Sequence, residues 1–99
     1  MLIMSISEIK EKITPILAAY GIKKASIFGS FSRGEERPDS DVDLLVELGP
    51  GPMDIFEYMQ FKEDLEKKLG KDVDVVTNRS LSEHLKPYIL PDLKSIYEG

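Results

Sequence analysis

The sequence contains no cysteine and only one histidine. The absence of cysteine excludes disulfides and zinc sites built from thiolates. The single histidine, His84, is interpreted as a surface or packing residue rather than a metal ligand. No stretch approaches the ~20 consecutive apolar residues of a membrane-spanning helix, and the first residues lack the basic leader of a signal peptide. We therefore expect a cytoplasmic protein that has no contact with a membrane.

Positive charge is also scarce. Lys and Arg total 13 against 18 Asp and Glu, which gives a net charge of -5. An acidic chain repels a polyphosphate backbone, so we expect no direct binding of nucleic acid. The length of 99 residues predicts a single domain over 1–99. A domain this small has no second lobe, so a function that needs a cleft with two walls would need another chain to supply one wall.

Two helices are predicted from apolar residues that recur every three or four positions. The first covers residues 7–20, with Ser7 as its cap and a kink at Pro15. The second covers residues 54–69 and is capped by Asp54. Its predicted apolar face consists of Ile55, Phe56, Met59, Leu65 and Leu69.

Three strands are predicted, over residues 24–28, 41–48 and 72–76. A further helix is predicted between residues 80 and 97, interrupted near its two prolines. The order helix, strand, loop, strand, helix, strand, helix indicates an α/β fold of the α+β two-layer kind, a small sheet covered by helices.

The second strand carries two carboxylates, Asp41 and Asp43, at alternate positions. Because strand side chains alternate between faces, both project to the same side, with Cα atoms ~6–7 Å apart. Like charges this close repel each other unless a cation lies between them, and a hard divalent cation bound by carboxylate oxygens relieves that repulsion. Two such cations could clamp a phosphoryl group. Taken alone, the same pattern also suits the solvated face of an edge strand.

The turn before that strand contains Gly29, Ser30 and Arg33. Glycine allows a sharp turn and a close approach of the backbone to a ligand. The serine hydroxyl and nearby N–H groups could hold phosphate oxygens, and a guanidinium suits phosphate. Each residue also has an ordinary interpretation, as a strand-to-helix turn or a surface ion pair. In combination with the carboxylates, they favour a phosphate site.

Two other ligand-binding motifs are excluded by the residues that carry their mechanism. Gly29 and Gly34 have the spacing of a P-loop, but Glu35 stands at the position of its lysine. The aspartates at 39–43 mimic the start of a calcium-binding loop, but Leu44 replaces its glycine.

A third carboxylate, Asp74, lies inside the apolar run of the third strand. If this strand pairs beside the second, Asp74 could join Asp41 and Asp43, bind a second ion and accept a proton from an attacking hydroxyl. A solvated strand face is an equally good interpretation of Asp74 from the sequence.

These residues together resemble the polymerase-beta-like nucleotidyltransferase superfamily, and in particular its minimal nucleotidyltransferase group. The resemblance rests on Gly-Ser at 29–30, Arg-Gly at 33–34, "SDVDL" at 40–44 and "VDVV" at 73–76. It implies a mixed sheet flanked by helices, the nucleotidyltransferase fold. It also implies roles for individual residues: Gly29, Ser30 and Arg33 on the phosphate side of ATP, and Asp41, Asp43 and Asp74 as catalytic ligands of two Mg²⁺ ions.

Members as short as this chain resemble antitoxins that form a hetero-oligomer with a HEPN-domain toxin. The resemblance implies transfer of AMP from ATP to a hydroxyl of the toxin, expected to be a tyrosine. Two alternatives remain open at this point. The chain could neutralise its partner by binding alone, or it could modify a small molecule such as an aminoglycoside.

Overall fold

The computed structural model describes residues 5–34, 41–49, 53–78, 82–84 and 86–98. Within these ranges no helix is long and apolar enough to cross a membrane. The elements, in chain order, are α1 (Ile6–Ala19), β1 (Lys24–Phe28), α2 (Ser30–Arg33), β2 (Val42–Glu47), α3 (Ile55–Leu69), β3 (Val73–Thr77), α4 (Lys86–Ile89), the 3-10 turn η1 (Leu90–Asp92) and β4 (Lys94–Glu98).

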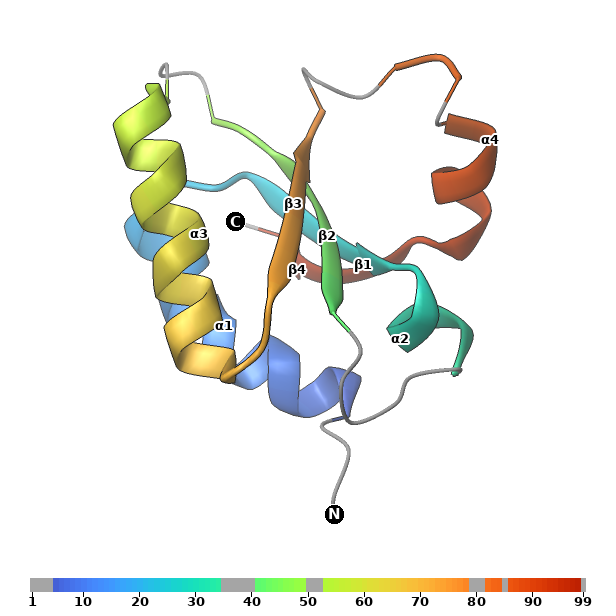
Figure 1. The fold of residues 1–99 in the computed structure, drawn as a ribbon, viewed down its shortest axis with the longest axis horizontal. Coiled ribbons are helices and arrows are strands. Elements are labelled where there is room, and N and C mark those ends of the chain that lie inside the picture. The colour runs from blue at the N-terminus through green and yellow to red at the C-terminus, as the bar shows by residue number, and fades with distance from the viewer. Residues whose placement is uncertain (1–4, 35–40, 50–52, 79–81, 85, 99) are drawn as a thin grey trace.

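The four strands form one mixed sheet in the order β3-β2-β1-β4. β2 pairs parallel with β3, while β1 pairs antiparallel with both β2 and β4. The long helices α1 and α3 pack together against one face of the sheet, and the short helices α2 and α4 lie away from α3, at the right of the view (Figure 1). The α/β fold and the mixed sheet that the sequence predicts are therefore confirmed.

The core lies between the sheet and the two long helices. Strand residues alternate in burial, so β2 directs Val42, Leu44 and Val46 into the core and its other residues to the opposite face. Ile9, Ile13 and Leu17 of α1 meet them at the spacing of a helical stripe, as predicted. This alternation leaves every second residue of the central strands on the face that the long helices do not cover.

Helix α1 begins earlier than predicted. Ser5 is its N-cap instead of Ser7, and the Ser5 hydroxyl accepts a hydrogen bond of 3.1 Å from the Glu8 N–H. The sequence around Ser5 has the spacing of a capping box, with an acidic residue three positions after the serine. Pro15 lies inside one continuous helix.

The apolar face predicted for α3 is wrong for three of its five residues. Leu65 and Leu69 are buried as expected, but the fully buried residue of the preceding turn is Phe61. Ile55, Phe56 and Met59 are instead 63%, 79% and 60% exposed. The helix carries two apolar stripes offset by about one residue, and periodicity does not tell which of them faces the sheet. The cap is as predicted, because Asp54 accepts a 2.8 Å hydrogen bond from the Glu57 N–H.

The helix predicted between residues 80 and 97 is wrong. Within the described part of that segment, the chain forms only the single turn α4 and the turn η1 before it extends into β4. Pro87 lies in the first turn of α4, where proline is tolerated, and Pro91 prevents α4 from continuing as a regular helix. β4 pairs with β1 and places Ile96 in the core. His84 lies in a turn and is exposed, in agreement with its interpretation as a surface residue.

Candidate active site

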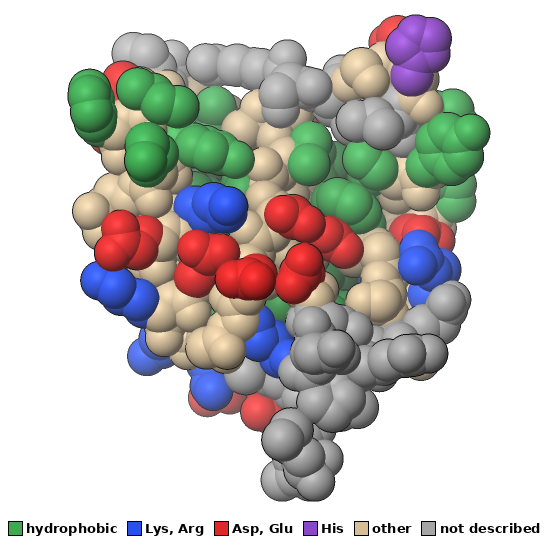
Figure 2. Space-filling view, in the orientation of Figure 1, with side chains coloured by type: hydrophobic (Ala, Val, Ile, Leu, Met, Phe, Trp, Pro, Cys, Tyr) green, Lys and Arg blue, Asp and Glu red, His purple; other side chains and the backbone are tan. Residues whose placement is uncertain are grey.

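The strand register places Asp43 of β2 directly opposite Asp74 of β3. Phe28 of β1 lies opposite Asp43 on its other side, so the three residues form one row across the sheet. This row lies on the face that α1 and α3 do not cover. Acidic side chains form a band across the middle of this face, with apolar side chains over the start of α3 and over α4 (Figure 2). The sheet therefore brings together two carboxylates that are 31 positions apart in the sequence.

The surroundings of the Asp43 carboxyl group disfavour its ionised form. Its pKa is raised from 3.8 to about 6, first by burial, then by the charge of Asp74 and a hydrogen bond with Asp74, and also by the charge of Asp41. The positive charge of Arg33 acts in the opposite direction. Two carboxyl groups that hydrogen-bond to each other share one proton. A cation bound between the two carboxyl groups would relieve the repulsion that raises this pKa.

Gly29 lies against that carboxyl. Its φ is 76°, a backbone conformation that residues other than glycine rarely adopt. A Cβ atom added at this position would overlap Asp43 Oδ2. The turn that the sequence predicts as a phosphate site therefore directly contacts the carboxylate of β2, and only glycine allows this approach. Ser30 follows as the first residue of α2.

Asp41 precedes β2 and is exposed. Its charge contributes to the raised pKa of Asp43, so it acts on the same site. Among the residues that the structure describes, no group of three His, Cys, Asp or Glu side chains is gathered closely enough to hold a metal ion by itself. The donor chemistry nevertheless fits Mg²⁺, because carboxylate oxygens are its preferred protein ligands and it is bound by few of them together with water and substrate phosphates.

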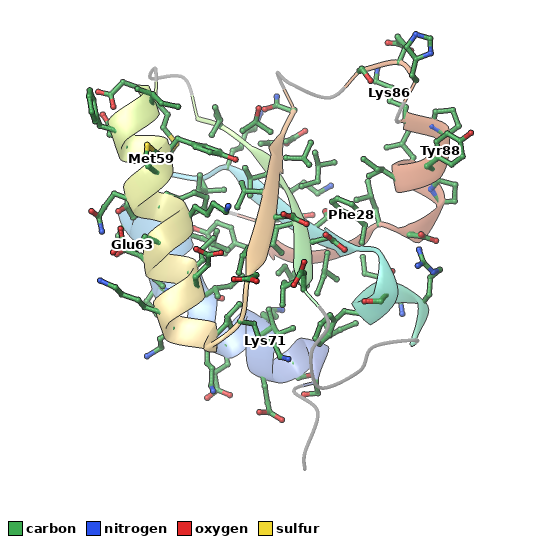
Figure 3. All side chains as sticks on the ribbon, viewed as in Figure 1. Phe28, Met59, Glu63, Lys71, Lys86 and Tyr88 are labelled. Atoms are coloured by element: carbon green, nitrogen blue, oxygen red, sulfur yellow. The ribbon has the colours of Figure 1, made fainter. Side chains whose placement is uncertain are left out.

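Arg33 takes part in an ion pair that the sequence did not reveal. Its Nη1 lies 2.8 Å from Asp92 Oδ2 of η1. The glutamates that follow it in the sequence lie outside the described residues. Sequence reasoning predicted Arg33 as a site residue but missed another cation, Lys71. The Lys71 Nζ lies 5.9 Å from the centre of the Phe31 ring. Figure 3 shows Lys71 at the end of the sheet where β2 begins. The only feature of the sequence that could have pointed to Lys71 is its position directly before Asp72 and Asp74.

Known proteins are similar to this chain in sequence and in fold. Residues 11–99 match the family model described as "Polymerase beta, Nucleotidyltransferase". The chain is 49% identical over 87 residues to a candidate protein adenylyltransferase, MJ0435, of Methanocaldococcus jannaschii, covering 88% of this chain and 92% of that protein. It is 31% identical over 97 residues to the protein adenylyltransferase MntA of Thermococcus cleftensis, covering 94% of this chain and 97% of that protein.

A solved structure with the same fold is a toxin-antitoxin crystallised with AMP-PNP. Its matching chain superposes with a TM-score of 0.78 at 26% identity, over 91% of this chain and 73% of that chain.

Proposed function

Because the chain belongs to the polymerase beta nucleotidyltransferase family, we propose that it transfers AMP from ATP to a hydroxyl group of a partner protein and so acts as an antitoxin. The partner is a HEPN-domain toxin, and the acceptor is a tyrosine. The observation that carries the proposal is the pair Asp43 and Asp74, which face each other beside the Gly29 turn. The relatives named protein adenylyltransferases and the toxin-antitoxin structure support the same conclusion.

The chain's own residues account for the chemistry in the following way. Gly29 and Ser30 hold the outer phosphates of ATP, and Arg33 adds positive charge on the same side, within electrostatic reach of Asp43. Asp41, Asp43 and Asp74 would hold two Mg²⁺ ions, which supply charge neutralisation on the triphosphate when bound. A bound cation would relieve the burial and repulsion that raise the pKa of Asp43, and would so lower that pKa towards its ordinary value.

The transfer forms one bond and breaks one. The acceptor oxygen attacks the α-phosphorus, the bond from that phosphorus to the bridging oxygen of pyrophosphate breaks, and pyrophosphate leaves with the electron pair. The proton of the acceptor hydroxyl passes to the Asp74 carboxylate, which is exposed on the open face of the sheet. The products are an AMP-modified hydroxyl and pyrophosphate.

The surface around the carboxylates favours a protein acceptor over a small molecule. Phe56 and Met59 on α3 are 79% and 60% exposed, and Tyr88 on α4 is 78% exposed. Figure 3 places Met59 and Tyr88 on opposite sides of the open sheet face. Large apolar side chains exposed on both sides of a reactive site indicate a surface that another protein covers. A partner in this position supplies the wall that so small a domain lacks.

The test is a transfer assay with radiolabelled ATP, Mg²⁺ and a HEPN-domain toxin as partner, and a protein of that kind encoded by a neighbouring gene would be the first choice. The wild type is expected to label the partner, and the double variant Asp41→Asn, Asp43→Asn is expected to leave it unlabelled. Glu11→Gln, which removes an exposed carboxylate from α1, is the matched control and is expected to label the partner fully. Mass spectrometry of the labelled partner tests whether the acceptor is tyrosine. If the wild type silences the partner without labelling it, the enzymatic proposal is wrong and binding alone explains the neutralisation.

A further inference from the structure

Helix α2 is too short to hold its own position. It consists of four residues, Ser30–Arg33, and its N-cap Gly29 makes no side-chain capping bond. A single helical turn is unstable in water without outside contacts, because nucleation costs more than one turn of hydrogen bonds returns. The position of the turn at residues 29–30 therefore depends on what holds α2 in place.

Three consecutive residues of α2 supply those contacts. Phe31 is 2% exposed and inserts into the core. The Ser32 hydroxyl donates a hydrogen bond to the backbone carbonyl of Asp92. The Arg33 guanidinium donates a 2.8 Å hydrogen bond to the Asp92 carboxylate. One residue of η1 thus binds two neighbouring side chains of α2, across 59 and 60 positions of sequence.

The burial of these side chains distinguishes a contact that stabilises the fold from one that orients α2. Ser32 is 6% exposed, and a buried hydroxyl needs a hydrogen-bond partner, which Asp92 provides. The side chains of Arg33 and Asp92 are 47% and 21% exposed, so their ion pair contributes little to the free energy of folding. A hydrogen bond from a planar guanidinium to a carboxylate is nevertheless directional. The pair is therefore better suited to orienting α2 than to stabilising the chain.

A displacement of α2 would also move Gly29 relative to the Asp43 carboxyl group. Gly29 immediately precedes α2 and lies so close to Asp43 that no Cβ atom fits between them. We propose that Asp92 is a positioning residue for nucleotide binding. Through Ser32 and Arg33 it holds the turn at residues 29–30 beside Asp43, in the geometry that receives the triphosphate. This inference rests on the proposed function for the identity of the ligand, and on the observed contacts for the mechanical link.

Titration with AMP-PNP and Mg²⁺ tests the effect on binding. Asp92→Asn keeps the carbonyl that Ser32 binds and removes the charge that Arg33 binds. The Kd is expected to rise roughly threefold to tenfold, the effect of losing one partly exposed charged hydrogen bond. The matched control is Glu98→Gln, which removes the carboxylate of another ion pair in the C-terminal segment, Lys24 with Glu98 at 3.9 Å. The control is expected to bind with the wild-type Kd.

A double-variant cycle distinguishes positioning from a general effect on folding. If Asp92 acts through Arg33, adding Asp92→Asn to Arg33→Gln raises the Kd no further. Amide hydrogen exchange gives a readout that does not depend on nucleotide: the amides of residues 30–33 are expected to exchange faster in Asp92→Asn than in Glu98→Gln, while those of α3 remain unchanged.

The outcomes separate this inference from the proposed function. An Asp92→Asn variant that binds AMP-PNP with the wild-type Kd overturns the inference, and so does a fully additive cycle. If the wild type itself binds no AMP-PNP, the proposed function is wrong, and the exchange rates alone then decide the link between η1 and α2. Unchanged exchange at residues 30–33 overturns that link.

Discussion

Replacing Asp43 with asparagine is expected to stabilise the metal-free protein at neutral pH, although it removes a residue placed in the catalytic site. The Asp43 pKa is raised from 3.8 to about 6, chiefly by burial and by Asp74. The folded chain therefore binds this proton more tightly than the unfolded chain. At pH 7.5 both states are ionised at this position, and the folded state bears the cost of the buried, repelled charge. Asparagine removes that charge and keeps a donor for Asp74.

The magnitude follows from the pKa values. One pKa unit corresponds to about 1.4 kcal/mol, so the full difference would be about 3 kcal/mol. Asp43 is only partly buried, and solvent screening reduces this to about 1–2 kcal/mol. The cost diminishes as the pH falls from about 6 towards 3.8, because the folded state then takes up the proton first. The advantage of the variant over the wild type is therefore expected at pH 7.5 and is expected to be much smaller at pH 4.5.

The assay is urea unfolding of wild type and Asp43→Asn at both pH values, in the presence of EDTA. Glu11→Gln, which also removes one carboxylate, controls for the general effect of net charge. Replacing EDTA with Mg²⁺ is expected to stabilise the wild type and not Asp43→Asn, since only the wild type retains the ligand. A variant that is no more stable than the wild type at pH 7.5, or whose advantage is equally large at pH 4.5, would refute the reasoning.

Three further predictions concern other parts of the chain. Gly29→Ala is expected to abolish AMP-PNP binding and to destabilise the fold by more than the ~1–2 kcal/mol cost of a left-handed backbone conformation, as measured by titration and urea unfolding. Gly34→Ala, at φ 72° with nothing within 4 Å of the added Cβ, is expected to show only that cost. Tyr20→Phe is expected to lower the melting temperature, because the Tyr20 hydroxyl donates a 2.7 Å hydrogen bond to Asp64. That bond raises the Tyr20 pKa to about 12, so the advantage of the wild type is present below pH 10 and should disappear as the pH rises towards 12. Phe56→Asp is expected to weaken association with the proposed HEPN-domain partner in a pull-down without changing the melting temperature, since Phe56 is 79% exposed.

Features encoded in short stretches were predictable from the sequence. Alternation in "DVDLLVEL" identified β2 and put Asp43 on the face opposite the buried residues, and the spacing of apolar residues identified α1 and α3. The turn with Gly29 and Ser30 was predicted after the first strand, and the structure has Gly29 directly before α2. Each of these features depends on residues within about one or two turns of each other, where backbone geometry alone relates them.

The remaining features were decided by packing between distant segments. Asp74 faces Asp43 only because β3 pairs parallel with β2 in one particular register, and a slip of one residue would turn Asp74 into the core. The inward stripe of α3 was chosen by the sheet it covers, and the last segment became β4 because β1 offered a free edge. Asp92 reaches Arg33 across 59 residues. The sequence by itself therefore determined which chemical groups this protein has and which way they point locally. Only the tertiary structure decided which of them meet, because that choice minimises the free energy of the whole chain rather than of any one segment.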